Sequence, residues 1–192
     1  MPFSHNKIII IAAPSGAGKT SVVCHLLKAM PDQLAFSISA ATRKPRAHEK
    51  DKVDYYFISA DEFRERINRD EFVEWEMVYE GKYYGTLKSE LKRIWDEQKT
   101  PLLDVDVQGG IHVQAQFPGN SLSLFIEPPS IEELEKRLRA RGTESPSSLK
   151  ARISKASYEM TFKNHFNHII INDSLERACA EAELIVRDFI VS

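Results

Sequence analysis

Residues 13 to 20, with the sequence APSGAGKT, constrain the fold of this chain more than any other stretch. They directly follow the four isoleucines at 8–11, which predict a strand buried on both faces. They directly precede a stretch at 21–30 whose apolar periodicity predicts a helix. A glycine-rich loop between a buried strand and a helix is typical of an α/β protein with a phosphate-binding loop.

The residue types in this loop suit a bound phosphate. Gly16 and Gly18 can adopt backbone conformations closed to other residues, so that successive N–H groups point at an anion. Lys19 supplies a mobile positive charge, Thr20 a hydroxyl that can ligate Mg²⁺, and the start of the helix the positive end of its dipole. We therefore predict a phosphate site formed by Ala13, Pro14, Ser15, Gly16, Ala17, Gly18, Lys19 and Thr20.

Ala13 departs from the usual motif, G-x-x-x-x-G-K-[ST], in which the first position is glycine. A methyl group costs little there if the residue is still extended at the end of the strand, whereas a positive φ would strain the loop. The alternative is a glycine-rich turn that binds nothing. That alternative does not account for Gly18, Lys19 and Thr20 after a run of isoleucines. A loop that binds phosphate therefore remains the prediction, and it requires an extended backbone at Ala13.

Length, charge and cysteine content narrow the class of protein. With 192 residues the chain suffices for one domain, or one domain with a small insertion. Its 26 basic and 28 acidic residues predict no general attraction to nucleic acid or to an anionic membrane. Cys24 and Cys179 lie far apart and favour a reducing compartment. Since no apolar stretch approaches a membrane span, we expect a cytoplasmic protein, with its oligomeric state left open.

β-Branched or aromatic runs alternate with amphipathic segments, which predicts an α/β fold with a largely parallel sheet. The expected strands are 7–12, 35–40, 101–107, 121–126 and 168–172. The expected helices are 19–30, 86–97, 110–116, 131–141, 147–162 and 175–190. Residues 37–86 break the alternation with short aromatic strands, one short helix and polar turns. We therefore predict a small mixed α/β lobe at 37–86, inserted into a core of 1–36 and 87–192.

A basic turn in this insertion predicts a second phosphate site. Arg43 and Arg46 are three residues apart on a turn stiffened by Pro45, so that both guanidinium groups can converge on one phosphate. Tyr55 and Tyr84 can add hydroxyl donors to the same group. Taken alone, the two arginines would be read as a solvated basic turn. The motifs that surround them favour the phosphate site.

Glu74 lies between Val73 and Trp75, an unusual place for a carboxylate unless its partner comes from a ligand. Guanine can supply that partner, since its N1–H and N2 amino group donate side by side, while a hydroxyl of Ser39 or Thr86 could donate to O6. Adenine would leave the buried carboxylate without a donor. A surface charge at a strand edge is the alternative interpretation.

Two further groups of residues suit phosphate chemistry. Residues 102–106, LLDVD, predict an apolar strand that presents Asp104 and Asp106 on one face, at the carboxyl end where ligands bind in such sheets. We predict that Asp104 contacts Mg²⁺, directly or through water, and that Asp106 contacts the nucleotide bound at the second phosphate site. Arg137 and Arg141 share one helix face, and Arg152 begins the next helix. From these residues alone, the arginines would be read as solvent-exposed.

Together these motifs make the chain resemble the guanylate kinases, nucleoside monophosphate kinases that transfer a phosphoryl group from ATP to GMP. The motifs are SGxGK, TRxPR, DYxF, EFxEW, YYGT, LDxDxQG and RLxxRG, in the family's order across essentially the whole chain. The resemblance implies a P-loop NTPase-type fold with a five-stranded parallel sheet flanked by helices. It also implies an inserted lobe that binds GMP and a helical lid at about residues 137–152.

The resemblance implies roles for individual residues. It assigns contacts with GMP to Ser39, Arg43, Arg46, Tyr55, Glu74, Tyr84, Thr86 and Asp106. It assigns Lys19, Arg137, Arg141 and Arg152 to catalysis at the donor phosphates, and Asn172 to the adenine side of the ATP site. The implied reaction is in-line transfer from Mg²⁺-ATP without a general base. We expect dGMP to serve as well, because no residue in the sequence identifies a reader of the ribose 2′-hydroxyl.

Two other classes of protein share parts of this pattern. A catalytically silent guanylate-kinase-like interaction module would bind phosphorylated partners through the acceptor site. Such modules normally lose the ATP loop, which Gly18, Lys19 and Thr20 preserve here. A kinase for another monophosphate would keep the loop but would not need Glu74 beside two hydroxyl donors. Turnover with a panel of monophosphates distinguishes the three.

Overall fold

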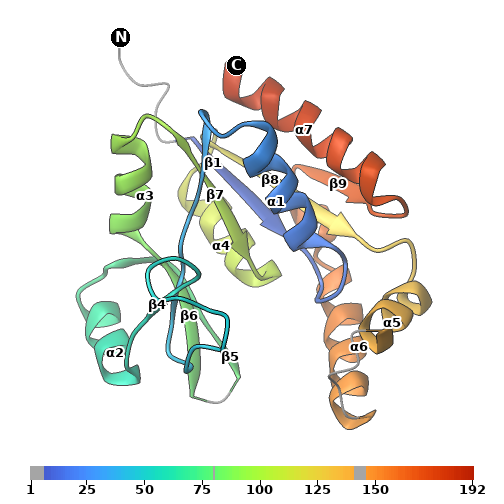
Figure 1. The fold of residues 1–192 in the computed structure, drawn as a ribbon, viewed down its shortest axis with the longest axis horizontal. Coiled ribbons are helices and arrows are strands. Elements are labelled where there is room, and N and C mark those ends of the chain that lie inside the picture. Colours follow the sequence, from blue (N-terminus) through green and yellow to red (C-terminus); the bar gives the residue numbers. More distant parts are fainter. Residues whose placement is uncertain (1–6, 80, 141–145) are drawn as a thin grey trace.

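A computed structural model describes residues 7–79, 81–140 and 146–192. Five strands form a central sheet in the order β2–β7–β1–β8–β9, and each adjacent pair is parallel (Figure 1). These strands are β1 (Ile8–Ala12), β2 (Leu34–Phe36), β7 (Thr100–Val105), β8 (Ser121–Glu127) and β9 (His168–Ile171). The predicted five-stranded parallel sheet is confirmed.

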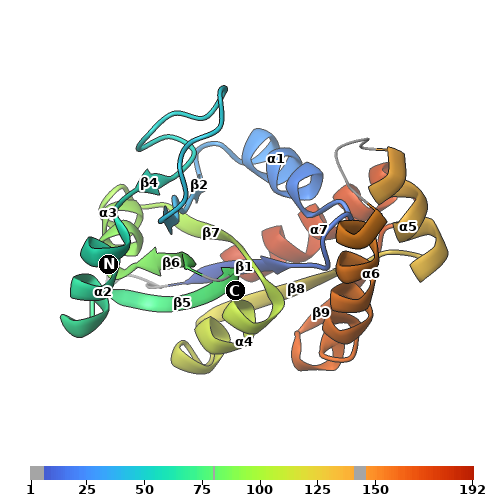
Figure 2. The ribbon, with the colours of Figure 1, turned by 90° about the horizontal axis from the view of Figure 1, so that it is seen from below.

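The run of isoleucines in β1 fills both faces of this sheet. Ile9 and Ile11 pack in a cluster with residues of α1 (Lys19–Ala29) and α7 (Leu175–Val191). Ile8 and Ile10 pack in a second cluster with residues of α3 (Lys88–Asp96) and α4 (Val107–Gln116). All four isoleucines are fully buried, as expected of a central strand covered on both sides. Figure 2 shows α1 and α4 on opposite faces of the sheet.

A second, smaller sheet has the strand order β4–β3–β6–β5. Its strands are β3 (Ala40–Ala41), β4 (Tyr56–Phe57), β5 (Phe72–Tyr79) and β6 (Lys82–Leu87). The long pair β5 and β6 is antiparallel, whereas β3 and β4 are parallel. In Figures 1 and 2 this sheet lies on one side of the molecule, and α5 (Ile131–Ala140) and α6 (Pro146–Met160) lie on the other.

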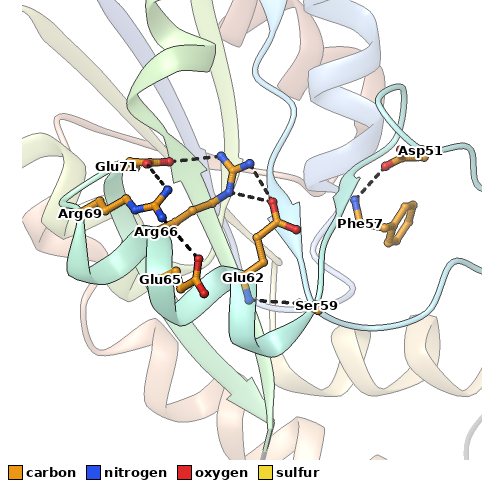
Figure 3. A network of polar contacts seen from close by, with 8 residues as sticks. All are labelled: Asp51, Phe57, Ser59, Glu62, Glu65, Arg66, Arg69 and Glu71. Atoms are coloured by element: carbon orange, nitrogen blue, oxygen red, sulfur yellow. Dashed lines mark hydrogen bonds and ion pairs between the residues drawn. The ribbon is translucent and has the colours of Figure 1, made fainter.

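Helix α2 (Ala60–Asn68) covers the small sheet and is attached to it by apolar and charged contacts. Phe63 stacks on Phe72, with 4.3 Å between ring centroids. The Ser59 hydroxyl accepts the Glu62 N–H and so caps the helix. Arg66 pairs with Glu62 and with Glu71, just before β5 (Figure 3). Figure 3 also shows Arg69 with Glu65 and Glu71, and Phe57 donating to Asp51.

Expectations from the sequence are wrong at three points. The strand expected at 101–107 ends at Val105, and the helix expected at 110–116 begins at Val107, because Asp106 caps α4 instead of continuing the strand. The strand expected at 35–40 is divided between the sheets, because Ser37 N–H still donates to Leu102 in the large sheet, whereas Ile38 N–H donates to the Glu90 carboxylate. The chain therefore leaves the large sheet at residue 38. The helix expected at 86–97 begins only at Lys88, because 82–87 form β6 and pair with β5.

Helices α5 and α6 pack on one another through Leu134, Leu138, Leu149 and Ala156. After α6, a single turn of 3-10 helix (Lys163–His165) leads into β9. Arg141, which we expected in the lid, lies outside the described residues. None of the helices within the described ranges combines the length and the apolar character needed to cross a membrane.

Candidate active site

The loop between β1 and α1 has the backbone that a phosphate site requires. Gly16 and Gly18 have φ angles of 94° and 100°, in the region open to glycine. Ala13 is not among the described non-glycine residues with positive φ, which are Lys52, Asp70 and Gln98. Its methyl group packs into the core cluster below α1. Alanine at the first motif position therefore introduces no backbone strain.

Asn172, which follows β9, is hydrogen-bonded to this loop through its side chain. Its side-chain Nδ2 donates to the Ala17 carbonyl at 2.7 Å, and the residue is 4% exposed. A Cβ atom at Gly18 would lie only 2.1 Å from that nitrogen. The Asn172 backbone carbonyl in turn accepts from Arg137 Nη2 at 3.0 Å. Asn172 thus links the loop to α5, and its contact with adenine stays a prediction.

A first cavity of about 390 Å³ opens above the loop. Lys19 lies in its wall, with Nζ 2.6 Å from Asp104 Oδ1 and 2.7 Å from the Val105 carbonyl. Arg152 approaches from α6, with Nη1 3.5 Å from Ser15 Oγ. The remaining lining residues are Ala13, Pro14, Gly16, Gly18, Thr20, Ser21, Tyr55, Asp106, Lys155 and Glu159.

A second cavity of about 200 Å³ lies between this loop and the small sheet. Its lining residues are Lys19, Ser39, Tyr55, Glu74, Glu76, Tyr84, Gly85, Asp104, Val105 and Asp106. Lys19, Tyr55, Asp104 and Asp106 line both cavities. Ligands bound in the two cavities would therefore meet at these four side chains.

Glu74 is held in the second cavity by Thr86. The Thr86 hydroxyl, which is fully buried, donates to Glu74 Oε1 at 2.7 Å. Burial raises the pKa of Glu74 to about 7, and the Asp106 charge adds to this rise while the bond from Thr86 opposes it. The Thr86 hydroxyl, which with Ser39 was one of two candidates to donate to O6 of guanine, donates to the carboxylate in this structure. Its contact with a base stays a prediction. Of the two hydroxyl candidates for that contact, Ser39 lines the cavity.

Asp106 has a structural contact as well as a place in both cavity walls. Its side chain caps α4 by accepting the Gly109 N–H at 2.8 Å. Gly109 also packs against Glu74, because a Cβ atom there would lie 2.9 Å from Glu74 Oε2. The start of α4 therefore positions both carboxylates.

Arg43 forms a bidentate ion pair with Glu49, a residue that the sequence analysis missed. The distances are 2.5 Å from Nη1 to Oε2 and 2.7 Å from Nη2 to Oε1. Arg43 Nε also donates to the Tyr84 hydroxyl at 3.1 Å, and the guanidinium lies 4.8 Å from the Tyr55 ring centroid. The bonds from Arg43 hold the pKa of Glu49 at about 2, against the opposite effect of burial. The sequence does offer one signal for this ion pair, an acidic residue three positions after Arg46 in the basic turn.

Arg46 differs from Arg43 in its exposure. Its backbone N–H donates to Glu49 at 2.8 Å, but its side chain is 68% exposed. The cations of this turn line a separate open hollow formed by Thr42, Arg43, Lys44, Arg46, Gly81 and Lys82. Tyr55 and Tyr84, which both contact Arg43 and line the second cavity, thus link that cavity to the basic turn.

The sequence model of guanylate kinase matches residues 5–189. The chain belongs to the guanylate kinase family. It is 46% identical to a guanylate kinase of Bacteroides fragilis over 96% of this chain and 90% of that protein. It is also 46% identical to one of Porphyromonas gingivalis, over 96% and 98% respectively. The crystal structure of guanylate kinase from Anaplasma phagocytophilum matches with a TM-score of 0.75 and 26% identity, over 97% of this chain and 87% of that one.

Most residues that the family resemblance singled out lie around the two cavities. Arg137 does not line either cavity, because its Nε contacts Glu133 and its Nη2 the Asn172 carbonyl. Arg152 does line the first cavity. The roles assigned to these residues from the guanylate kinase resemblance stay predictions.

The first cavity offers oxygen ligands suited to Mg²⁺. The Thr20 hydroxyl and the Asp104 carboxylate both lie in its wall, and Mg²⁺ prefers such hard oxygen donors. Across the described part of the chain, His, Cys, Asp and Glu side chains form no group of three or more placed to hold a metal. The donor set therefore fits an ion bound mainly through substrate phosphates and water, with one or two protein oxygens.

Proposed function

We propose that this chain catalyses the ATP-dependent phosphorylation of GMP, and also of dGMP, to the corresponding diphosphate. In this proposal residues 37–86 form the GMP-binding lobe, 1–36 and 87–192 form the core, and 137–152 form a lid. The observation that carries it is the wall shared by the two cavities, Lys19, Tyr55, Asp104 and Asp106. A donor on the glycine loop and an acceptor under the small sheet would meet there.

The donor ATP binds with its phosphates on residues 13–20, where the N–H groups and Lys19 neutralise charge. Lys19 pairs with Asp104, and in this proposal its ammonium group also contacts the ATP phosphates. Arg152, Arg137 and Arg141 close over the transferred group and stabilise the charge on its equatorial oxygens. We assign Asn172, which donates to the Ala17 carbonyl of the loop, to the adenine side of the ATP site.

The acceptor base binds at Glu74, which suits guanine because N1–H and the N2 amino group donate to one carboxylate. Ser39 donates to O6. Adenine is rejected because it offers an acceptor at N1 and would leave the buried Glu74 carboxylate without a donor. Site chemistry of this kind can discriminate by about 10⁴-fold to 10⁵-fold.

The acceptor phosphate binds between Tyr55, Tyr84 and the basic turn. Since the Tyr84 oxygen accepts the Arg43 Nε–H, its own O–H is directed to donate elsewhere, and the phosphate is the partner that we assign. Arg46, whose side chain is largely exposed, turns inward to the same phosphate. Asp106 contacts the acceptor from the shared wall.

The chemical step requires positioning and charge neutralisation. An anionic oxygen of the GMP phosphate attacks the γ-phosphorus of ATP in line, the new P–O bond forms as the bond to the β,γ-bridging oxygen breaks, and ADP leaves. No proton has to be removed from the nucleophile, so no side chain acts as a general base. When bound at Thr20 and Asp104, Mg²⁺ supplies charge neutralisation at the donor phosphates.

We also propose that the protein works in the cytoplasm on small-molecule substrates. Both cysteines, exposed Cys24 and buried Cys179, are free thiols, which suits a reducing compartment. ATP, GMP and dGMP are the partners that the site supports.

The test is ADP formation from Mg²⁺-ATP with GMP, dGMP, AMP, UMP and dTMP assayed in parallel. We expect turnover with GMP and dGMP only. Turnover with another base would keep the kinase and contradict the role of Glu74. A folded protein without turnover on any of them would favour the interaction module, and binding of GMP without ATP would then identify it.

A further inference from the structure

The face of the small sheet that lines the second cavity carries four polar side chains in a defined order. Glu74 lies opposite Thr86, and Glu76 lies opposite Tyr84, in the antiparallel register of β5 and β6. Alternate residues of a strand share one face, so Glu74 and Glu76 both point to the cavity that they line. Trp75, which lies between them in β5, points the other way and is 41% exposed.

This order gives Glu76 a defined place along a bound nucleotide. The base reader, Glu74 with Thr86, lies at one step of the ladder. Tyr84, which is bonded to Arg43 at the phosphate end, lies one step further and directly opposite Glu76. A nucleotide with its base on Glu74 and its phosphate on Tyr84 therefore carries its sugar past Glu76.

The Glu76 side chain is held at this position from a different element. His112 of α4 lies with Nδ1 3.3 Å from Glu76 Oε1. The side chain is 30% exposed, and it lines the cavity together with Glu74 and Tyr84. It has the reach and the acceptor atoms to contact a ligand that donates hydrogen bonds.

A ribose offers the matching donors, since its 2′-hydroxyl and 3′-hydroxyl lie side by side and a carboxylate can accept from such a pair. We propose that Glu76 accepts a hydrogen bond from the ribose 2′-hydroxyl of the acceptor nucleotide and so favours GMP over dGMP. This inference rests on the proposed function and adds a specificity residue to it. The sequence analysis found no such reader, because only the register of β5 and β6 places Glu76 one step from the base reader and directly opposite Tyr84.

The size of the effect follows from the chemistry of the contact. A hydrogen bond to an ionised acceptor contributes about 10-fold to 100-fold in affinity. Removing the Glu76 carboxylate should therefore lower kcat/KM for GMP by about 10-fold or more, and should leave dGMP nearly unchanged because dGMP lacks the donor. The ratio of kcat/KM for GMP to that for dGMP should fall towards one.

The experiment compares wild type, Glu76→Ala, Glu76→Gln and the control Glu65→Ala with GMP, dGMP and IMP at saturating Mg²⁺-ATP. Glu65 is an exposed glutamate of α2 in the same lobe, so the control makes the same charge change away from both cavities. We expect Glu76→Ala alone to abolish the preference for GMP over dGMP. A separate series with ATP varied at saturating GMP should give an unchanged KM for ATP. Glu76→Gln keeps an acceptor oxygen and should retain part of the preference.

Three results would overturn the proposal. The first is that Glu76→Ala lowers kcat/KM equally for GMP and dGMP. The second is that Glu76→Ala changes the ratio of kcat/KM for GMP to that for IMP but leaves the ratio for GMP to dGMP intact. The third is that wild type has the same kcat/KM for GMP and dGMP. Calorimetric binding of GMP and dGMP to wild type and Glu76→Ala gives the same ratios without turnover. Failure of the proposed function would appear separately, as wild-type protein that does not turn over GMP.

Discussion

The core and the small sheet are stabilised in different ways. The core buries the β1 isoleucines between helices on both faces of its sheet. Among the side chains that the structure describes, the small sheet has a smaller apolar cluster, whose fully or nearly fully buried members are Ala40, Phe63, Phe72 and Leu87. Its elements are otherwise joined by carboxylates with several partners, among them Glu49, Glu74 and Glu90. Charge changes should therefore affect the region around the small sheet more than the core.

Glu90 on α3 is the clearest of these carboxylates, because it joins the two regions. It is 2% exposed and accepts the Ile38 N–H at 3.0 Å and the Tyr56 hydroxyl at 2.7 Å. Arg93 pairs with it at 2.8 Å. Burial tends to raise the pKa of Glu90, but the bonds from Arg93, Ile38 and Tyr56 outweigh it and hold the pKa below its usual range. An ionised group on α3 therefore ties the chain at Ile38 and Tyr56 to the core.

The largest expected effect is the loss of this group. Glu90→Ala should lower the free energy of unfolding by about 2–4 kcal/mol, because it leaves the Ile38 N–H and the Tyr56 hydroxyl without their acceptor. Arg93 adds less, since it is 41% exposed and keeps its contact with Glu97. Chemical denaturation measures the change. The control is Glu97→Ala, which removes the exposed partner of the same arginine and should cost less than about 1 kcal/mol. Equal effects of the two substitutions would contradict the contrast between the regions.

In the core, the position most sensitive to a small change should be Gly18. Gly18→Ala combines a φ of 100° with a Cβ atom 2.1 Å from Asn172 Nδ2, so the loop must move. We expect turnover to fall by about 10²-fold or more, as for a misplaced catalytic group. Gly119→Ala is the control, since Gly119 also has a positive φ but open space around it. Comparable activity of the two variants in a kinase assay would exclude the loop geometry described above.

A smaller effect is expected at Glu49, which orients Arg43 toward Tyr84. Glu49→Gln replaces a charged acceptor by an amide, so one Arg43 N–H faces another donor. We expect the KM for GMP to rise about 10-fold and the KM for ATP to stay the same. Steady-state kinetics with each substrate varied give both values. A lower KM for GMP would show instead that Glu49 competes with the acceptor phosphate, and Glu62→Gln in the same lobe serves as the control.

The smallest effect is a pH dependence that originates in Glu74. Its pKa of about 7 means that kcat/KM for GMP should rise with pH and level off above about 7, as the carboxylate that accepts from guanine becomes ionised. The pKa is raised in the folded protein, so the stability that this group contributes is present below its unfolded pKa and is lost as pH rises through 7. Glu74→Gln should remove both dependences. A rise in kcat/KM that persists in Glu74→Gln would assign it to another group.

The parts of the fold that the sequence predicted are those specified by local chemistry. The isoleucine run and the residues after it predict strand, loop and helix without reference to the rest of the chain, and Asp104 follows from the strand that carries it. Strand β6 and the division of 35–40 were missed because both depend on partners distant in sequence, β5 and Glu90. Glu49 and Glu76 were missed for the same reason. In the sequence both look solvent-exposed, and only the contact with Arg43 places Glu49 and only the register of β5 and β6 places Glu76.

The central claim is that donor and acceptor meet at the wall shared by the two cavities. The most direct test is inhibition by a single molecule that carries adenosine and guanosine at the two ends of a chain of five phosphates. We predict that it inhibits competitively against both ATP and GMP, and that the analogue with adenosine at both ends binds more weakly because Glu74 rejects the second adenine. Competition with only one substrate, or equal inhibition by the two analogues, would contradict the account.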